Sequence, residues 1–559
     1  MKNYDQLSFS NFIPDVVSRF ANNNALGYVD EPAMTYAQMG KNIEAVKAFL
    51  EAGNIKPGDK VVIYSQNMPN WGVVYFALQC MGVVAVPVLP DFNAHELQNV
   101  LEHSEAKVIF ISKSLESRLQ EVDSEFIEMA IRIDDYEVIK GENKRFIFDE
   151  NAVCTNSYTP KENEMAILLY TSGTTGNSKG VMLSQKNVLT NVIQSSGVQE
   201  ILETDRFLSV LPLSHTYENT IGLLLPISKG ASVSYLTKPP VASVLLPALA
   251  KVKPTLMLTV PLIIEKVFKA SVLPTIQKKK ATRFMHKYKL TRKLVYRIAG
   301  KKLYQTFGGN LKFFGIGGAK LDPMVEEFLR YAKFPYAIGY GLTETAPLLA
   351  GSNPKQTKLQ AIGPKVDNLE LIINNPDAKT GEGEIWAKGP NVMLGYYKNE
   401  EKTKEVLTED GWFKTGDLGV YDKKGNLSHK GRLKNLIVGA NGENIYPEEI
   451  ESLINNFKHV AESIVVQQKG KLVALVHFDR EELELKLKEI KSDLTHKVDD
   501  KLEEISQKVD KTINELADEL KLYINSRVNK ISRIQSLIIH PEPFIKTATK
   551  KIKRYLYNN

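Results

Sequence analysis

Apolar and polar residues alternate in blocks along the first part of the chain. Short β-rich runs occupy residues 60–65 (KVVIYS), 83–88 (VVAVPV) and 107–112 (KVIFIS). Between them, residues 71–81 and 94–103 carry apolar side chains at helical spacing. This strand–helix–strand–helix–strand order predicts a mostly parallel sheet covered by helices.

Further apolar runs predict more strands of the same kind. They occupy residues 165–170, 206–211, 232–236, 255–260, 312–316 and 336–338. From about Gly431 the pattern changes to a short α+β region, with predicted strands at residues 463–467 and 472–478. We therefore predict an α/β fold, in which residues 1–430 form a large N-terminal domain of layered, mostly parallel sheets with helices. Residues 431–559 are expected to form a small mobile C-terminal α+β domain.

A charged stretch near the C-terminus carries a single apolar stripe. Its members recur every three or four positions: Leu483, Leu487, Ile490, Leu494, Val498, Leu502, Ile505, Val509, Ile513, Leu516 and Leu520. This spacing predicts one long helix or a helix pair packed on its own domain. An oligomerising coiled coil is the alternative.

The composition is that of an ordinary globular protein and excludes disordered and fibrous classes. Of 559 residues, 43% are hydrophobic and 25% are charged, and the net charge of +7 is a mild excess. This charge suits polyanionic ligands such as nucleotides, or an anionic membrane surface, and no nucleic acid partner is expected. Two cysteines, Cys80 and Cys154, exclude a disulfide scaffold and a cysteine metal site.

Neither a signal-like apolar run at the N-terminus nor an apolar stretch of about 18 residues is visible. We therefore expect no transmembrane helix and a cytoplasmic location. A cytoplasmic protein attached peripherally to the inner face of the membrane is the alternative.

The most informative segment is the loop at residues 170–180 (YTSGTTGNSKG), which follows a predicted strand. Its glycines let the backbone approach a ligand, its hydroxyls and amides offer donors, and Lys179 adds a positive charge, so it suits a polyphosphate. It is not a Walker A loop, because Gly180 follows the lysine and Gly176 does not directly precede it. A surface turn is the alternative.

This loop closely resembles the phosphate-binding loop of the adenylate-forming superfamily of acyl-CoA synthetases, adenylation domains and luciferases. Further motifs follow in that family's order: LPLSHTYE (211–218), GIGGA (315–319), YGLTE (340–344), GWFKTGD (411–417), GRLK (431–434) and KTATKKIKR (546–554). The resemblance covers nearly the whole chain and is closest to the long-chain fatty acyl-CoA synthetases. One departure is Lys320, which follows GIGGA where the family often has proline.

The resemblance implies an ATP site. Its expected residues are Thr171, Ser172, Gly173, Thr174, Thr175, Gly176, Lys179, Gly318, Ala319, Tyr340, Gly341, Asp417, Arg432 and Lys434. By this resemblance the GIGGA turn holds adenine, Tyr340 stacks near it, and Arg432 contacts the ribose. Asp417 would accept both ribose hydroxyls, as a carboxylate is able to. Lys434 occupies the hinge between the two domains.

The resemblance also implies a catalytic set of Lys551, Thr343, Glu344 and His215. Thr343 would bind the α-phosphate, and His215 would lie near the reacting carboxylate. Glu344 would hold Mg²⁺, with Thr174 as the second protein oxygen, because a hard cation between phosphates prefers oxygen ligands.

Each of these motifs has an alternative interpretation. A lone histidine such as His215 is also typical of a hydrogen-bonded core. The GIGGA segment is also typical of a tight loop that needs glycine, and the basic C-terminal tail is also typical of a solvated chain end. The catalytic lysine is matched to Lys551, and Lys550 stays open as the alternative.

The expected activity is that of a long-chain fatty acid:CoA ligase, which uses ATP, Mg²⁺ and coenzyme A as the co-substrate. A fatty acid carboxylate attacks the α-phosphorus of ATP to give acyl-AMP and pyrophosphate, and the thiol of coenzyme A then displaces AMP. The alternatives are a ligase for an aryl or branched acid, a synthetase that loads an acyl carrier protein, and a catalytically silent lipid- or nucleotide-binding relative.

An insert at residues 277–304 is basic and apolar together. Its basic residues are Lys278, Lys279, Lys280, Arg283, Lys287, Lys289, Arg292, Lys293, Arg297, Lys301 and Lys302, with Phe284, Tyr288, Leu294, Val295 and Ile298 interleaved. Such a surface suits an anionic membrane from which fatty acid is collected. A solvated helix face with a buried apolar side is the equally open alternative.

Overall fold

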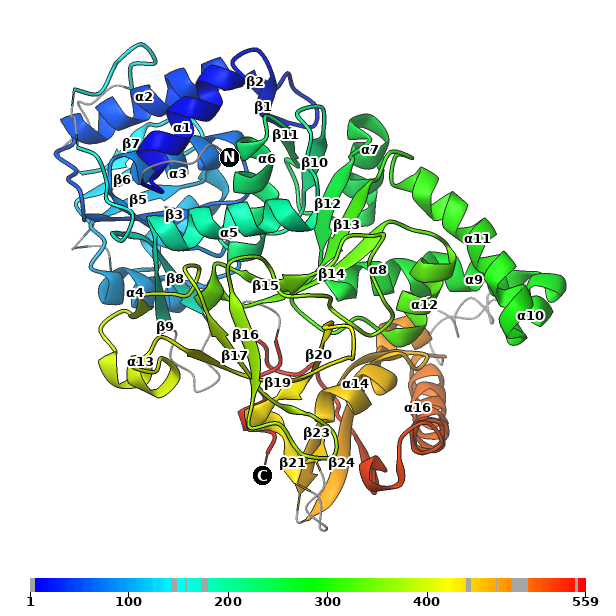
Figure 1. The fold of residues 1–559 in the computed structure, drawn as a ribbon. Helices are drawn as coiled ribbons and strands as arrows, with labels where there is room; N and C mark the ends of the chain where they lie inside the picture. The colour runs from blue at the N-terminus through cyan, green and yellow to red at the C-terminus, as the bar shows by residue number, and fades with distance from the viewer. Residues whose placement is uncertain are drawn as a thin grey trace.

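The structure is a computed structural model that describes residues 6–123, 125, 127–141, 148–155, 158–171, 179–438, 444–468, 470–484, 501–547 and 551–558, with the backbone alone for 501–508. Two eight-stranded sheets form the larger part of the molecule (Figure 1). The first runs in the order β18 (Gly395–Tyr396), β9 (Lys179–Ser184), β8 (Met165–Thr171), β4 (Val84–Val88), β3 (Lys60–Tyr64), β5 (Val108–Ile111), β6 (Met129–Arg132) and β7 (Val138–Lys140).

The second sheet runs in the order β15 (Leu348–Gly351), β14 (Tyr336–Gly341), β13 (Phe313–Ile316), β12 (Leu256–Thr259), β10 (Arg206–Ser209), β11 (Ser232–Tyr235), β1 (Asn24–Tyr28) and β2 (Met34–Thr35). In both sheets the central strand pairs are parallel and the pairs near the edges are antiparallel. The predicted α/β class is confirmed.

Helices cover both sheets and fill the space between them. They are α1 (Phe9–Arg19), α2 (Tyr36–Ala52), α3 (Pro69–Cys80), α4 (Ala94–Ser104), α5 (Gln185–Val198), α6 (Leu225–Ser228), α7 (Ala242–Val252), α8 (Pro261–Val267), α9 (Leu273–Lys278), α10 (Lys280–Lys287), α11 (Lys289–Thr306), α12 (Pro323–Tyr331) and α13 (Glu400–Val406). Helix α3 contacts β3 and β4 of the first sheet and β1 of the second. Its residues are apolar all round, as expected of a helix buried between two layers.

A four-stranded antiparallel sheet follows along the chain, and the sequence patterns did not predict it. Its order is β16 (Glu370–Asn374), β17 (Gly383–Lys388), β19 (Phe413–Tyr421) and β20 (Leu427–Arg432). In β17 every second residue is buried and the others are half-buried. Such strands lack the continuous apolar runs that reveal fully buried parallel strands, because only one face meets the core.

The C-terminal part has a hydrophobic core of its own. It contains α14 (Pro447–Asn455), β23 (Val460–Gln468), β24 (Lys471–Phe478), β25 (Ser536–Ile539) and α16 (Lys501–Asn525). Val509, Ile513 and Leu520 of the predicted apolar stripe lie in this core, so this part of the stripe packs on its own region. Residues 485–500, which hold other members of the stripe, lie outside the described residues.

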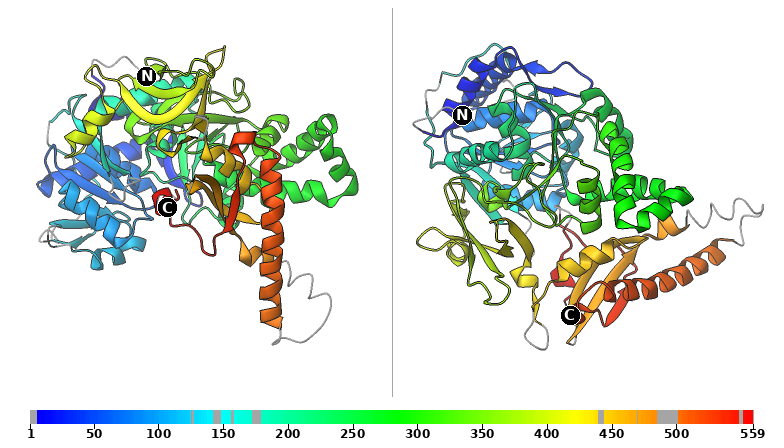
Figure 2. Two further views of the ribbon diagram at one scale, coloured as in Figure 1. Left: turned by 90° about the horizontal axis from the view of Figure 1, so that it is seen from below. Right: turned by 45° about the vertical axis from the view of Figure 1, so that its right-hand side comes forward.

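Two features concern the outer surface. Helices α10 and α11 project from the edge of the molecule, away from the large sheets (Figures 1 and 2). Among the helices in the described ranges, none combines the length and apolar composition that a membrane span requires.

Candidate active site

The predicted phosphate-binding loop joins two paired strands of the first sheet. Strand β8 ends at Thr171, β9 begins at Lys179, and these two residues face each other in the antiparallel register. The strand pair therefore holds Lys179 at the base of the loop. The remaining predicted contacts, Ser172, Gly173, Thr174, Thr175 and Gly176, lie outside the described residues, and with them the predicted metal ligand Thr174.

Glu344 stands in a short turn, η4 (Thr343–Thr345), directly after β14. Its Oε1 accepts a hydrogen bond from Tyr396 Oη at 2.9 Å. The ring of Tyr396 in turn lies 4.9 Å from Lys179 Nζ, measured to the ring centroid. The predicted metal ligand and the phosphate-loop lysine are thus brought together on one tyrosine that the sequence patterns did not single out.

Asp417 and Arg432 face each other across the pair β19–β20. Arg432 Nε lies 2.8 Å from Asp417 Oδ1, and Tyr340 Oη donates to Oδ2 at 2.8 Å. Burial alone would raise the pKa of Asp417, but the hydrogen bond from His429 and the charge of Arg432 outweigh it and hold that pKa below its usual value. The carboxylate is therefore ionised, and its buried Oδ1 lies 2.8 Å from Arg432 Nε and 3.5 Å from His429 Nε2.

Lys551, from the C-terminal tail, lies near the same group of charged residues, Asp417, Arg432 and Glu344. Its removal from water and the charge of Arg432 lower its pKa, while the negative charges of Asp417 and Glu344 oppose this shift. All three groups therefore lie close enough to the ammonium to act on it. The alternative lysine, Lys550, lies outside the described residues.

The C-terminal tail is fixed to its own domain close to Lys551. Arg554 Nη2 forms an ion pair with Glu451 Oε2 at 2.7 Å, and its Nη1 donates to the carbonyl of Val465 at 2.8 Å. Thr547 N donates to the carbonyl of Lys551 at 2.8 Å. Lys551 is therefore flanked on both sides by residues with hydrogen bonds to described parts of the chain.

His215 is the nearest candidate for contact with a reacting acid. Burial and the charge of Lys551 lower the pKa of His215 to about 4. Its Nδ1 lies 3.2 Å from the backbone N–H of Tyr217, in a position to accept a hydrogen bond. The ring is therefore neutral near pH 7 and carries its proton on Nε2, from which it can donate to an oxygen.

Four positive side chains gather around this centre. Partial burial and the charges of Arg432, Lys179 and Lys551 lower the pKa of Lys434 to about 8, with Asp417 opposing the shift. The four positive charges outnumber the two carboxylates of Asp417 and Glu344 in the same centre. A polyanion such as a nucleotide phosphate chain would neutralise this excess.

The glycine-rich turns after β13 and β14 need their glycines for close approach. A Cβ added at Gly317 would lie 3.1 Å from Cζ of Tyr217, whose ring covers the turn that leads to Gly318 and Ala319. A Cβ added at Gly341 would lie 2.0 Å from the carbonyl oxygen of Pro347. Both turns therefore bring backbone close to the site, as a ligand held by peptide groups requires.

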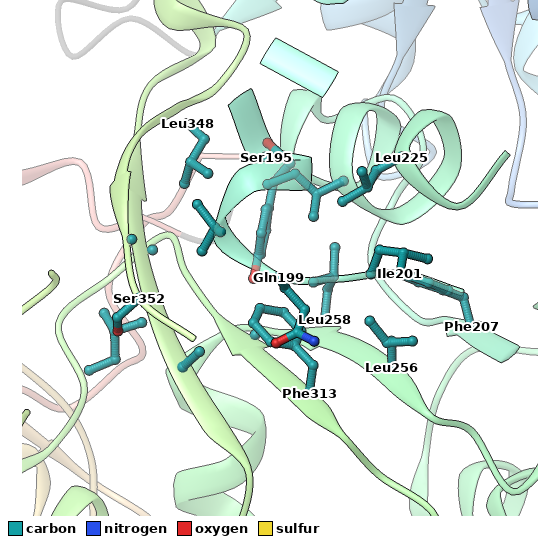
Figure 3. A pocket seen from close by; sticks show the side chains of 18 residues that line it. Ser195, Gln199, Ile201, Phe207, Leu225, Leu256, Leu258, Phe313, Leu348 and Ser352 are labelled. Atoms are coloured by element: carbon teal, nitrogen blue, oxygen red, sulfur yellow. The ribbon is translucent and has the colours of Figure 1, made fainter. Parts of the chain in front are cut away.

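A narrow apolar cavity of about 40 Å³ opens beside these turns (Figure 3). Gly315 and Gly339 line it from the carboxyl ends of β13 and β14, and Tyr217 lines it next to His215. Leu225, Leu256, Leu258, Phe207 and Phe313 form part of its remaining wall (Figure 3). Ligands of open α/β sheets bind at the carboxyl ends of the strands, and the apolar lining lies near that edge, although a volume of about 40 Å³ holds only a small apolar group.

The residues present fit a magnesium ion carried by a nucleotide. Within the described ranges, His, Cys, Asp and Glu side chains form no group of three or more that would hold a metal alone. Glu344 is half-buried, and only its Oε1 receives the hydrogen bond from Tyr396, so Oε2 can face a cation. One carboxylate together with substrate phosphates is the usual protein contribution to such a site.

Two predicted residues have less distinctive surroundings. Thr343 is half-buried beside Glu344, and its backbone carbonyl accepts a hydrogen bond from the N–H of Ala346. Ala319 is exposed at the end of the glycine-rich turn. The sequence patterns missed Tyr396 and His429. Tyr396 contacts Glu344, which lies far away in the sequence, and His429 contacts Asp417 across a strand pair. A local motif does not predict such contacts.

The chain is similar to known proteins along most of its length. A profile described as "AMP-binding enzyme" matches residues 14–397. A long-chain-fatty-acid–CoA ligase of Mycobacterium bovis is 30% identical over 487 residues, which cover 81% of this chain and 78% of the relative. A peroxisomal long chain acyl-CoA synthetase of Arabidopsis thaliana is 29% identical, with 80% and 68% covered.

Solved structures share the fold over nearly the whole chain. O-succinylbenzoate CoA synthetase of Bacillus subtilis, in complex with the acyl-adenylate OSB-AMP, matches with a TM-score of 0.75 at 22% identity and 98% coverage of both chains. An anthranilate CoA ligase in complex with anthranoyl-AMP matches with a TM-score of 0.75 at 18% identity, with 99% and 96% covered.

Proposed function

The chain belongs to the AMP-binding enzyme family, and from this premise we propose that it is an AMP-forming ligase that joins a long-chain fatty acid to coenzyme A. One observation carries the proposal. Lys551 comes from the C-terminal tail, and its ammonium lies near Asp417 and Glu344 of residues 1–430 and near Arg432 at the start of residues 431–559. This charged centre lies next to a cavity with apolar walls.

The proposed first step forms acyl-AMP. An oxygen of the substrate carboxylate bonds to the α-phosphorus of ATP, and the bond from that phosphorus to the pyrophosphate oxygen breaks. His215 donates from Nε2 to an oxygen of the reacting acid, while Lys551 and Lys179 stabilise the charge that gathers on phosphate oxygens. Mg²⁺ held by Glu344 would supply further charge neutralisation.

In the proposed second step the sulfur of coenzyme A bonds to the acyl carbon, the bond from that carbon to AMP breaks, and the thiol gives up its proton. The division into residues 1–430 and 431–559 with a hinge at Lys434 belongs to this proposal. Rotation about the hinge would withdraw Lys551 and make room for the thiol, a type of domain motion known in enzymes.

Two observations support a fatty acid as the substrate. The cavity beside Tyr217 is lined mainly by aliphatic and aromatic side chains, which match an alkyl chain in chemistry, although its volume of about 40 Å³ holds only a small part of one. The relatives in Mycobacterium bovis and Arabidopsis thaliana are named for long-chain acids. An aryl acid is the competing substrate class that an acid panel separates.

The decisive experiment is AMP release from ATP with purified protein, coenzyme A and a panel of acids. We expect AMP that depends on both palmitate and coenzyme A, and little with benzoate or short acids. AMP release with benzoate and coenzyme A but not with palmitate would refute the long-chain proposal and would leave the proposed reaction in place. No AMP with any acid, from protein that binds ATP, would refute the ligase itself.

We also propose that the insert attaches the enzyme to an anionic membrane surface. Residues 266–321 contain fifteen Lys or Arg residues and no Asp or Glu, although the whole chain carries only +7. On α11, Leu290, Leu294 and Ile298 lie four residues apart on one face and are 82%, 51% and 67% exposed. The opposite face is already covered, since Tyr296 stacks edge-on against Phe328 of α12.

An exposed apolar stripe bordered by basic residues fits a bilayer interface better than water, because lipid buries the stripe and acidic headgroups pair with the lysines. The test is flotation with vesicles that contain phosphatidylglycerol, in low and high salt. We expect flotation at low salt, its loss in neutral vesicles, and its reduction by the L290S/L294S double substitution. Absence of binding to anionic vesicles at low salt would refute this role.

A further inference from the structure

A short segment, residues 393–397, connects the two sides of the charged centre. Met393 N donates to the carbonyl of Glu344 at 2.9 Å. Two residues later, the strand β18 pairs with β9, the strand that begins at Lys179. One strap of chain is therefore bonded both to the turn that carries the carboxylate and to the strand that carries the lysine.

The side chain of Tyr396 also connects the two sides, because it contacts both the carboxylate of Glu344 and the ammonium of Lys179. Its Oη donates to Glu344 Oε1 at 2.9 Å, and its ring supports Lys179 Nζ at 4.9 Å from the centroid. Only 6% of Tyr396 is exposed, so the contacts are made away from bulk water, where a hydrogen bond to a carboxylate and a cation–π contact are both strengthened.

The strap has little freedom to move. Gly395 has φ +140°, and a Cβ added there would lie 2.8 Å from Cγ2 of Thr403. The backbone N–H of Tyr396 donates to Thr403 Oγ1 at 2.9 Å. A short helix, α13, thus braces the tyrosine from behind, which is the arrangement that a positioning group needs.

We propose that Tyr396 is a positioning residue that sets the distance and orientation between Glu344 and Lys179, so that the metal and the phosphates of one nucleotide meet both at once. This inference rests on the proposed function, since it assumes a magnesium nucleotide. The hydrogen bond from Tyr396 to Oε1 fixes the orientation of the Glu344 carboxylate, so that Oε2 is presented to the cation. The ring holds the ammonium of Lys179 in place before a phosphate arrives.

The matched control is the neighbouring residue on the same strap. Tyr397 points to the other side, where its Oη donates to Glu105 Oε2 at 3.3 Å and its ring contacts His103. The substitutions Tyr396→Phe and Tyr397→Phe each remove one hydroxyl from the same segment and keep the ring. A third variant, Tyr396→Leu, removes the ring as well.

The test is the magnesium dependence of ATP binding, measured by titration calorimetry without acid or coenzyme A. The rate of ATP–pyrophosphate exchange is measured separately, with the acid present. Loss of a group that orients a metal ligand typically costs 10- to 100-fold in metal affinity. We therefore expect Tyr396→Phe to raise the magnesium concentration for half-maximal ATP binding at least about tenfold, with unchanged ATP affinity in EDTA. Tyr396→Leu should weaken ATP binding in EDTA too, and Tyr397→Phe should behave as the natural protein.

The outcomes separate the two proposals. If the natural protein binds ATP with no dependence on magnesium and supports no exchange, the proposed function fails. Suppose instead that ATP binding by the natural protein depends on magnesium and that the protein supports exchange. If Tyr396→Phe then keeps the natural thermal unfolding midpoint and the natural magnesium dependence, the function stands and the role of Tyr396 is wrong. An equal loss in Tyr397→Phe would also overturn it, because the effect would then belong to the strap as a whole.

Discussion

At the scale of single residues, the proposed division of the reaction predicts a selective defect at Lys551. Lys551→Ala should lower ATP–pyrophosphate exchange by about 10²–10³-fold, the cost of removing one preorganised electrostatic group. Thioester formation from supplied acyl-AMP should remain largely intact, because the lysine is withdrawn in that step. The two half-reactions are measured separately, with Lys553→Ala as the matched control from the same tail. Equal loss of both half-reactions would contradict the proposed role.

A second residue, Glu218, predicts a pH-dependent effect on stability. Glu218 is 2% exposed, and burial raises its pKa to about 8, although Ser209 Oγ donates to its Oε1 at 2.5 Å. Between pH about 4.5 and 8 the unfolded chain releases this proton while the folded chain keeps it, so the stability of the natural protein falls as pH rises through that window. Below pH 4.5 both states hold the proton and this penalty disappears.

Glu218→Gln should therefore stabilise the protein at pH 7 by about 3 kcal/mol relative to its effect at pH 4.5. Urea unfolding at a series of pH values measures this difference. The exposed Glu401→Gln serves as the control and should show no such trend. A Glu218→Gln effect that is the same at both pH values would show that Glu218 does not titrate in this window.

The residues of the candidate site differ in how far the sequence revealed them. Lys179, Asp417 and Arg432 stand in motifs, and the structure brings them close together, while their roles toward ATP stay predictions. Tyr396 could not be found this way, because its partner Glu344 lies 52 residues earlier. A contact of this kind depends on how strands pair, which a local pattern does not encode.

At the scale of elements, fully buried strands were predictable and half-buried strands were not. Strand β3 and its parallel neighbours β4 and β5 are continuous apolar runs, and the predicted bounds agree with the structure to within about a residue or two. Strands β16 and β17 have one face in the core and one near solvent, so their patterns merge with loop sequence.

The packing of α11 on α12 gives a prediction for one glycine. A Gly→Ala change inside a helix ordinarily stabilises by about 0.5–1 kcal/mol. At Gly300 a Cβ would lie 2.3 Å from Cβ and 2.9 Å from Cα of Ala332, so the helices would have to separate. We expect Gly300→Ala to destabilise by about 1–3 kcal/mol, the usual cost of overpacking.

Chemical denaturation of the whole protein measures this change. Lys301→Ala, on the exposed side of the same helix, is the control and should stay within about 0.5 kcal/mol. ATP–pyrophosphate exchange should be unchanged in both variants, because α11 lies outside the charged centre. A stabilised Gly300→Ala variant would show that the two helices have room to adjust.

At the scale of the whole molecule, α14 and the residues just after it connect the C-terminal part to the large part. Lys320 Nζ and Glu449 Oε1 form an ion pair at 3.0 Å. Nearby, Asn456 Nδ2 donates to the carboxylate of Asp322, and Lys269 Nζ donates to the carbonyl of Asn455. These contacts accompany the placement of Lys551 in the charged centre, and the proposed rotation about Lys434 must break them.

The ion pair between Lys320 and Glu449 therefore predicts how the two half-reactions respond to charge. Glu449→Lys places two ammonium groups together, which should disfavour the orientation that holds Lys551 in the site. Surface pairs are worth up to about 1 kcal/mol, so exchange should fall about 2- to 10-fold, while thioester formation from supplied acyl-AMP should not fall. The double substitution Lys320→Glu with Glu449→Lys restores opposite charges and should recover most of the exchange rate. Because salt screens exposed charges, the defect of Glu449→Lys should shrink at high ionic strength. A double variant as slow as Glu449→Lys would show that Glu449 acts through contacts other than Lys320.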